Sequence, residues 1–192
     1  MTEKRIVLGV SGASGMEYAL ALARHLAAVP GLSVHGIISA GARQVLEHEC
    51  VRYGAELETY FQYVYAVDNV AAPPASGSWH HDGMVICPCS MASLAAIAQG
   101  VGTHLLHRAA DVCLKERRPL VLVVRETPLS AVHLRNMLRA HQAGAIIMPA
   151  CPGFYHQPRT LDDIVRHFAG RVMEQLGLPH TLYARWGETE SA

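Results

Sequence analysis

Six unbroken apolar or proline residues, 119–124, stand between two tight clusters of charged side chains. A Val-rich run of this kind, without polar alternation, predicts a strand that is buried on both faces of a parallel sheet. In open α/β sheets, ligands bind just beyond the carboxyl ends of the strands. Arg125 and Glu126 would emerge side by side at such an end, which makes them candidate site residues. A structural ion pair is the alternative.

Other segments repeat this pattern in alternation with helical spacing. Apolar runs predict strands at 5–10, 33–38, 83–87, 119–124 and 144–148. Helical periodicity predicts helices at 16–28, 42–49, 90–99, 104–115, 130–141 and 160–176, with Ser90 and Thr160 at their starts. Region 50–70 has poor periodicity, and 71–78 is a loop fixed by Pro and Gly. This alternation predicts a single α/β domain with a doubly wound parallel sheet of five or six strands.

Composition narrows the function. Sixteen basic and sixteen acidic residues leave no net charge, so nothing electrostatic favours nucleic acid or an anionic membrane, and a small-molecule partner is expected. The most apolar stretch, 84–98, is interrupted by Pro88 and Ser90, so no membrane span is expected. The five cysteines lack zinc-site or thioredoxin spacing, which points to a reducing, cytoplasmic compartment. A hydrophobic fraction of 51 % fits a homo-oligomer.

Two small-residue turns are candidate ligand sites. Gly12-Ala-Ser-Gly15 follows a predicted strand and opens a helix, where exposed N–H groups and the helix dipole favour a phosphate or another anion. The full Gly-x-Gly-x-x-Gly spacing is absent, so close packing is the alternative. Ser39 ends the second predicted strand and would lie on the same edge of the sheet as Ser14. The alternative is that Ser39 only stabilises its own turn. The second turn is Cys87-Pro-Cys-Ser-Met-Ala-Ser93. Its cysteines, Cys87 and Cys89, fit small core residues better than reactive thiols, whereas Ser90 and Ser93 are better placed to bind a ligand phosphate.

Basic and aromatic residues supply further candidates. Arg108 and Lys115 are seven residues apart on one helical face and could point toward the same phosphate, while Arg117 and Arg118 fit a solvated last turn. Tyr155 and His156 lie in a Pro-rich loop after the last predicted strand, where a phenol could bind phosphate or pack against a neighbouring subunit. His80-His-Asp82 is expected to face solvent, and no metal site is expected.

Several motifs taken together resemble one known family. They are Gly12-Ala-Ser-Gly15, Pro74-Ala-Ser-Gly-Ser78, Cys87-Pro-Cys-Ser90, the stretch from Arg108 to Arg118, Arg125-Glu-Thr-Pro128, Gly153-Phe-Tyr-His156 and Arg185-Trp-Gly-Glu188. In this order, and over nearly the whole chain, they resemble the UbiX/Pad1 flavin prenyltransferases. The likeness is weakest between residues 50 and 70.

The resemblance implies a fold, an assembly and a reaction. The fold would be a flavodoxin-like, Rossmann-like three-layer sandwich formed by residues 1–192 as a single domain, with 177–192 as a tail that packs on a neighbouring subunit of a dodecamer. The protein would transfer a dimethylallyl group from dimethylallyl phosphate or diphosphate to N5 and C6 of reduced FMN, without a metal. The product, prenylated FMN, would serve a UbiD-type decarboxylase.

The resemblance also assigns site residues. The implied flavin site consists of Gly12, Ala13, Ser14, Ser39, Ser90, Met91, Ala92, Ser93, Arg108 and Arg125, with Ser14 near N5. The implied phosphate site of the prenyl donor consists of Lys115, Glu126, Tyr155 and Arg171, the last two from another subunit. Ser14 and these four residues would form the catalytic set, in which Glu126 relays a proton and Lys115, Tyr155 and Arg171 stabilise the leaving phosphate.

Two positions depart from the family pattern, and two other functions remain open. Val70 stands where some members have an aromatic residue at the prenyl pocket, and Val124 stands where many have Pro. One alternative is an FMN-dependent decarboxylase of the same fold. The other is a non-catalytic subunit that carries FMN for an aryl-acid decarboxylase, which would have no use for a second phosphate site.

Overall fold

Strands from distant parts of the chain pair into one parallel sheet. The computed structural model describes residues 3–50, 54–185 and 187. The sheet in this part of the chain consists of β1 (Lys4–Val10), β2 (Leu32–Ile38), β3 (Tyr63–Tyr65), β4 (Gly83–Cys89), β5 (Leu120–Val124) and β6 (Ile146–Ile147). The strands lie in the order β3-β2-β1-β4-β5-β6, and every pairing is parallel. The predicted doubly wound α/β fold is therefore confirmed.

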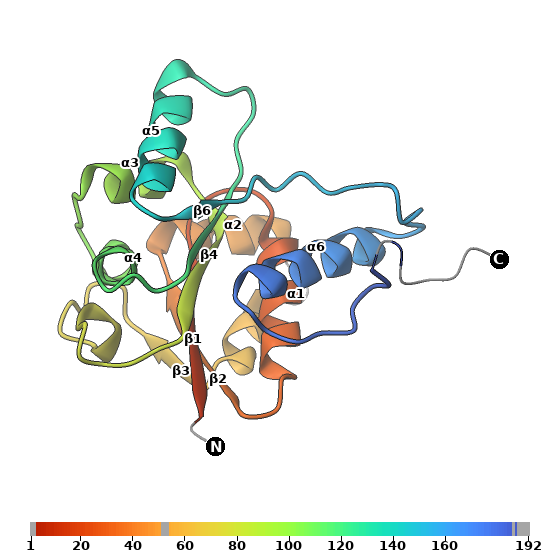
Figure 1. Cartoon of the computed structure of the whole chain (residues 1–192), viewed down its shortest axis with the longest axis horizontal. Helices are drawn as coiled ribbons and strands as arrows, with labels where there is room; N and C mark the ends of the chain where they lie inside the picture. Colours follow the sequence, from red (N-terminus) through yellow and green to blue (C-terminus); the bar gives the residue numbers. More distant parts are fainter. Residues whose placement is uncertain (1–2, 51–53, 186, 188–192) are drawn as a thin grey trace.

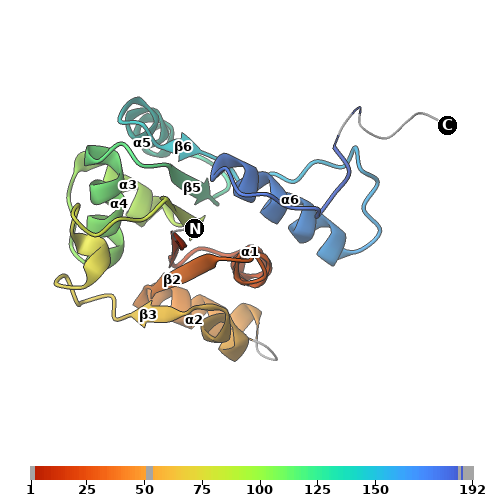
Figure 2. The ribbon, with the colours of Figure 1, turned by 60° about the horizontal axis from the view of Figure 1, so that its bottom comes forward.

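Helices cover both faces of this sheet. They are α1 (Met16–Ala27), α2 (Ala40–Glu49), α3 (Met91–Gln99), α4 (Leu105–Lys115), α5 (Ala131–Gln142) and α6 (Leu161–Gln175), with two short 3₁₀ helices, η1 (Gly54–Tyr60) and η2 (Pro73–Ala75). Figure 1 shows α3, α4 and α5 on one side of the sheet and α1 and α6 on the other, and Figure 2 shows the same three layers from another side.

Each face of the sheet has its own hydrophobic core, because successive strand residues point to opposite faces. On β1, Ile6 and Leu8 pack with α1 and α6, whereas Val7 packs with α3 and α4 on the other face. All three side chains are fully buried. The uninterrupted apolar runs of the sequence arise from this burial on both sides.

The helix starts that were predicted from capping residues are confirmed. Ser90 accepts a hydrogen bond from the Ser93 N–H at the start of α3, 3.2 Å away. Thr160 and Asp163 form a reciprocal capping box at the start of α6. Side-chain oxygens thus satisfy backbone donors that the first helical turn leaves unpaired.

The sheet edges differ from the prediction. Region 50–70, which lacked clear periodicity, contains η1 and the three-residue strand β3, in which Tyr63 is 54 % exposed. β6 is shorter than its apolar run suggested and covers only Ile146–Ile147. In the middle of the sheet, β4 continues through Pro88 to Cys89, beyond the predicted end at Cys87.

The expectation that His80-His-Asp82 faces solvent is wrong for its middle residue. His81 is 1 % exposed, and Nδ1 of its ring lies 3.2 Å from the Gly83 carbonyl oxygen. Asp82 accepts a hydrogen bond from the Arg5 N–H at 2.8 Å, which fixes the start of β4 beside β1. With Asp82 held there, His81 turns into the interior. Burial lowers the pKa of His81 to about 4.

The chain beyond α6 folds back on that helix. Leu178 is 5 % exposed in the core, and the Tyr183 ring lies 4.4 Å from the His167 ring of α6. The expected contact of 177–192 with a neighbouring subunit concerns a second chain, and Trp186 and residues 188–192 lie outside the described residues. None of the described helices combines the length and hydropathy needed to cross a bilayer.

Candidate functional site

The strand order reverses between β1 and β4, and predicted site residues meet at the carboxyl edge of this pair. The Ser11 hydroxyl donates to the Pro88 carbonyl oxygen at 3.0 Å, and the Ser90 N–H donates to the Ser11 hydroxyl oxygen at 2.8 Å. The turn after β1 is therefore tied to the start of α3. A crevice at such a switch point is the usual ligand site of doubly wound sheets.

Neighbouring strands add two predicted residues to this edge. The Ser39 N–H donates to the Val10 carbonyl oxygen at 3.0 Å, and the Arg125 N–H donates to the Cys89 carbonyl oxygen at 3.3 Å. The structure thus places Gly12, Ala13, Ser14, Ser39, Ser90, Met91, Ala92, Ser93, Arg125 and Glu126 at or just beyond one edge of the sheet. The expectations that Ser39 shares a sheet edge with Ser14 and that Arg125 and Glu126 emerge at a strand end are confirmed.

The turn after β1 requires glycine at two positions. A Cβ on Gly12 would lie 2.9 Å from the Gly41 carbonyl carbon, so the backbones of two adjacent turns are in direct contact. Gly15 has a φ of 107°, a conformation that other residues rarely adopt. Close packing of the backbone, the alternative explanation for the small residues of this turn, is therefore observed. It brings the ends of β1 and β2 within reach of one ligand.

The anion expected at the start of α1 is supplied by the protein itself. The Glu49 carboxylate accepts hydrogen bonds from the Gly15 and Met16 N–H groups at 2.8 and 2.9 Å. Burial raises its pKa, but hydrogen bonds from the Ser14 hydroxyl and these N–H groups, with the charge of Arg125, outweigh burial and lower the pKa overall. A phosphate at this helix start would meet a carboxylate.

Glu49 is the site residue that the sequence analysis missed. It lies at the end of α2, 34 residues from Gly15. No local spacing pattern relates the two positions, and a Glu in the last turn of a surface helix resembles any solvated side chain. Only the folded backbone shows that the carboxylate reaches the Ser14 turn.

The start of α3 is suited to a phosphate in a way that the start of α1 is not. The Ser90 and Ser93 hydroxyls lie 3.3 Å apart, and Arg125 follows the strand beside them. The thiols of Cys87 and Cys89 are buried, and burial raises the pKa of Cys89 to about 12, so the interpretation as core residues is confirmed. Helix N–H groups and two hydroxyls therefore meet here without a reactive thiol, and the chain brings Arg125 to the end of the adjacent strand.

Arg108 and Lys115 lie on one face of α4, as predicted, and this face is turned toward the loop after η2. The Arg108 Nε donates to the Ala75 carbonyl oxygen at 3.2 Å, and its guanidinium pairs with Asp111. The Lys115 ammonium pairs with Glu116 at 2.5 Å, beside Gly77. Both cations have carboxylate partners that a phosphate would have to replace.

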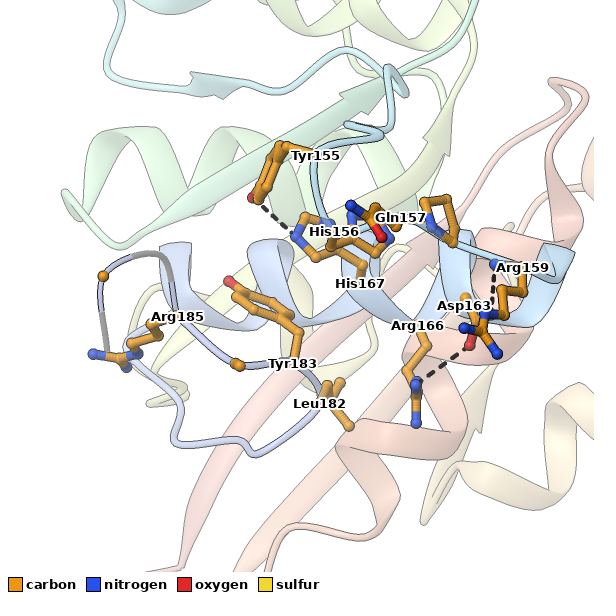
Figure 3. A pocket seen from close by; sticks show the side chains of 13 residues that line it. Tyr155, His156, Gln157, Arg159, Asp163, Arg166, His167, Leu182, Tyr183 and Arg185 are labelled. Atoms are coloured by element: carbon orange, nitrogen blue, oxygen red, sulfur yellow. Dashed lines mark hydrogen bonds and ion pairs between the residues drawn. The ribbon is translucent and has the colours of Figure 1, made fainter. Parts of the chain in front are cut away.

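Tyr155 and Arg171 line a shared pocket of about 650 Å³ on the arm formed by α6 and its flanking loops. The Tyr155 hydroxyl lies 3.0 Å from Nε2 of His167, and Arg171 pairs with Glu174. An adjoining pocket of about 890 Å³ is lined by Tyr155, His156, Arg166, His167 and Tyr183, and Figure 3 shows these side chains gathered along α6. The arm is thus basic and aromatic.

Within one chain, the predicted site residues therefore occupy three places. Ser14 and Glu126 are at the carboxyl edge of the sheet, Tyr155 and Arg171 are on the arm, and Lys115 precedes β5 at the amino edge. The five residues of β5 alone span roughly 16 Å. A single chain does not bring Lys115 to Glu126.

The features at the carboxyl edge fit FMN. Two closely packed turns contact each other through their backbones, and the N–H groups and serine hydroxyls at the start of α3 offer donors to a phosphate, with Arg125 following the adjacent strand. Comparison with known proteins agrees with this fit. A family model described as Flavoprotein matches residues 1–173. The flavin prenyltransferase UbiX of Deinococcus radiodurans is 46 % identical over 189 residues, which cover 97 % of this chain and 95 % of that protein.

The chain belongs to the UbiX family of flavin prenyltransferases. The UbiX of Escherichia coli K12 is 45 % identical over 185 residues, covering 95 % of this chain and 98 % of its own. A crystal structure of another UbiX, in complex with FMN and dimethylallyl pyrophosphate, superposes with a TM-score of 0.89 at 38 % identity and covers 98 % of this chain and all of its own.

Solved structures of UbiX proteins and more distant flavoproteins set the limits of this likeness. A dodecameric protein from Escherichia coli O157:H7, described as an FMN-dependent UbiX-like decarboxylase, has a TM-score of 0.91 at 40 % identity, with 95 % and 98 % of the two chains covered. The cysteine decarboxylase TvaF, at 14 % identity and a TM-score of 0.65, shares only the fold.

The two departures from the UbiX pattern occupy different surroundings. Val70 is 58 % exposed in the loop before η2, so it belongs to the surface of a single chain. Val124 is 3 % exposed and pairs with Cys89 in the sheet. Val124 is the last residue of β5, so Arg125 and Glu126 directly follow the strand at the carboxyl edge of the sheet.

Proposed function

We propose that this chain is a flavin prenyltransferase. It transfers a dimethylallyl group from dimethylallyl phosphate or diphosphate to N5 and C6 of reduced FMN and releases the phosphate. The product, prenylated FMN, passes to a UbiD-type decarboxylase. The observation that carries the proposal is the 46 % identity with a UbiX flavin prenyltransferase over 97 % of this chain. It is supported by the basic and phenolic side chains of Lys115, Tyr155 and Arg171, which lie away from the flavin edge within one chain and could bind a second phosphate in an oligomer.

The flavin site is proposed at the carboxyl edge of the sheet. Gly12, Ala13 and Ser14 would hold the flavin ring system. The remainder of FMN would be bound by Ser39, Ser90, Met91, Ala92, Ser93 and Arg125. Arg108 would reach the cofactor from a neighbouring chain. Reduced FMN supplies the nucleophilic N5. Ser14 would lie between that ring and Glu49, to which its hydroxyl is hydrogen-bonded, so the hydroxyl could take up the N5 proton while it passes its own proton to the carboxylate.

The second phosphate site lowers the barrier to loss of the leaving group. Lys115, Arg171 and the Tyr155 hydroxyl would donate hydrogen bonds to the phosphate oxygens as negative charge develops there. Glu126 would relay a proton at the edge of the flavin site. A protein that only carried FMN would not need this second set of donors, which is why the set favours catalysis over carriage.

The site is proposed to be complete only in an oligomer. Lys115 and the residues at the carboxyl edge lie at opposite ends of β5, so a neighbouring chain must supply one of the two groups. A homododecamer, as in the solved relative, would provide such contacts. Residues 1–192 would form one domain, with 177–192 as the segment that packs on the neighbour.

The protein is proposed to work in the cytoplasm. All five cysteines, which lie within the described ranges, are free thiols, and four of them are buried. Burial raises the pKa of Cys50 to about 11 and that of Cys113 to about 12. Unpaired thiols of this kind are typical of a reducing compartment.

The test is anaerobic incubation of the purified protein with reduced FMN and dimethylallyl phosphate or diphosphate, followed by mass spectrometry of the released flavin. The expected result is a mass gain of one C5 unit, lost in Glu126→Gln and retained in Glu47→Gln, a matched change on exposed α2. Unmodified FMN with both donors would contradict the proposal and favour a decarboxylase or a carrier.

A further inference from the structure

A chain of polar side chains runs from the proposed phosphate end of the flavin site into the interior of the protein. The Ser90 and Ser93 hydroxyl oxygens are 3.3 Å apart, and Nε2 of His107 on α4 lies 3.4 Å from the Ser93 oxygen. Nδ1 of His107 lies 3.3 Å from the Thr103 hydroxyl oxygen. The start of α3 is thereby linked to a buried imidazole that the proposed reaction does not use.

His107 is deeply placed and uncharged. It is 7 % exposed, and its ring stacks on His104 with a centroid distance of 3.8 Å. Burial and the neighbouring His104 lower the pKa of His107 to about 4, so the ring is neutral at physiological pH. Nδ1 of His104 is itself buried without a hydrogen-bond partner among the described residues.

A neutral imidazole has one donor and one acceptor nitrogen, so its tautomer sets the direction of this chain. With the proton on Nδ1, His107 donates to Thr103 and draws the Ser93 hydroxyl hydrogen inward. With the proton on Nε2, His107 donates to Ser93, and Thr103 donates to Nδ1. In this second state, the hydroxyl hydrogens of Ser93 and Ser90 can point away from His107, toward the start of α3 and its proposed ligand. The imidazole is neutral in both states, with one N–H proton.

We propose that His107 is a positioning residue, which in its Nε2–H tautomer turns the hydroxyl donors of Ser93 and Ser90 toward the phosphate of bound FMN. This inference rests on the proposed function. A phosphate selects the outward direction because hydrogen bonds to an anion are stronger than those between neutral groups. The distance of 3.3 Å between the two serine oxygens exceeds the usual O–H···O length, and the distance of 3.4 Å between His107 Nε2 and the Ser93 oxygen exceeds the usual N–H···O length, which leaves room for the hydroxyls to turn.

Two substitutions of equal polarity separate this role from simple packing between α3 and α4. The amide nitrogen of Gln occupies the place of Nε2, whereas Asn reaches only the place of Nδ1. His107→Gln keeps a donor for Ser93, and His107→Asn loses it. Both variants keep a buried amide, but Asn is shorter than Gln and leaves more space, so riboflavin is needed as a control: a packing defect would weaken the binding of FMN and of riboflavin alike.

The experiment measures the affinity of the intact protein and both variants for oxidised FMN and for riboflavin, by quenching of flavin fluorescence. Riboflavin lacks the phosphate and serves as the control ligand. We expect His107→Asn to weaken FMN binding by about tenfold, as for loss of a hydrogen bond to a charged group. Riboflavin binding should not change in either variant, and His107→Gln should bind FMN within about threefold of the parent protein.

Equal losses for FMN and riboflavin, or FMN binding by His107→Asn at the parent level, would overturn the inference. Ser93→Ala provides a second route that does not depend on the folding of His107→Asn, because it should show the same FMN-specific loss. Adding His107→Asn to Ser93→Ala should then cause no further loss that is specific to FMN, because the contact that His107 supports is already absent. Failure of the parent protein to bind FMN would instead overturn the proposed flavin site, and this inference with it.

Discussion

Lys115 and Glu126 lie at opposite ends of β5 within one chain. Lys115 is the last residue of α4 and precedes the strand at the amino edge of the sheet, whereas Glu126 follows it at the carboxyl edge. Both are exposed, and each has a local partner: Glu116 for Lys115 and the Thr127 N–H for Glu126. A reaction that needs both residues at one substrate must draw them from two chains.

Mixed oligomers test this division directly. Lys115→Ala and Glu126→Gln should each lower the prenylation rate by about 100-fold or more when assembled alone, because each removes a group that acts at the reacting atoms. Co-assembly in equal amounts should restore about a quarter of the parent activity, since random mixing gives that share of sites both native residues. The comparison is with the same two variants mixed after assembly. Recovery no greater than in that control would place both residues in one chain's site.

Glu49→Gln should fold but react slowly. The variant keeps an oxygen for the Gly15 and Met16 N–H groups but loses the negative charge that can accept a proton through Ser14. We expect the rate of prenylation to fall by about 100-fold, the usual scale of general-base catalysis. FMN affinity should change little. The rate is compared with Glu47→Gln, two residues earlier on α2, and equal rates for the two variants would contradict a role for Glu49.

Gly12→Ala and Gly41→Ala form a matched pair at one contact. A Cβ on Gly12 meets the Gly41 carbonyl carbon at 2.9 Å, which forces two backbones apart, whereas a Cβ on Gly41 meets Gly12 at an ordinary 3.5 Å. Gly12→Ala should lower the free energy of unfolding by roughly 1–3 kcal/mol and weaken FMN binding. Gly41→Ala should do neither. Denaturant titration and flavin quenching measure both effects, and similar behaviour of the two variants would refute the backbone contact.

Buried histidines should make the protein unstable in mild acid. Burial, together with the positive charge of Arg5 near His35 and of Arg118 near His81, lowers the pKa values of both histidines to about 4. In the unfolded chain these groups bind protons near pH 6.5, so stability holds above that pH and falls as the pH drops toward 4. Each adds a slope of up to about 1.4 kcal/mol per pH unit.

The measurement is the free energy of unfolding between pH 8 and pH 5 at fixed protein concentration. His81→Leu should reduce the slope of the free energy of unfolding against pH by the contribution of one histidine. This reduction is expected whatever the substitution does to stability at a single pH. His80→Leu, which changes the adjacent, exposed histidine, is the control variant. An unchanged slope in His81→Leu would show that His81 gains its proton in the folded protein.

The sequence predicted the interior of the fold well because burial on two faces leaves a clear pattern. Runs such as residues 119–124 have no other common explanation in a chain of this composition, and Ser90 marks its helix start by local chemistry. β3 was missed because three residues on an exposed edge have no buried face to reveal them. His81 was misplaced because its burial depends on the contact between Asp82 and Arg5, 77 residues apart.

The candidate site was predictable to the extent that motifs follow strands directly. Gly12, Ser39, Ser90 and Arg125 each follow a strand, so their meeting at one edge could be deduced from topology alone. Glu49 and His107 could not be found in this way, because each acts through the side chain or turn of another element. The separation of Lys115 from Glu126 also follows from the topology, but the resemblance had grouped them at one phosphate.

The Glu49 carboxylate has a further effect on how a flavin can enter the site. FMN is a molecule with a flat head and a charged tail, and two opposed placements along the sheet edge are conceivable. In the proposed site, the carboxylate at the start of α1 would repel the tail, while Arg125 and the serines of α3 would attract it. One fixed acid in the turn after β1 would thus give the crevice a polarity and turn the reactive head toward Ser14 before any second substrate arrives.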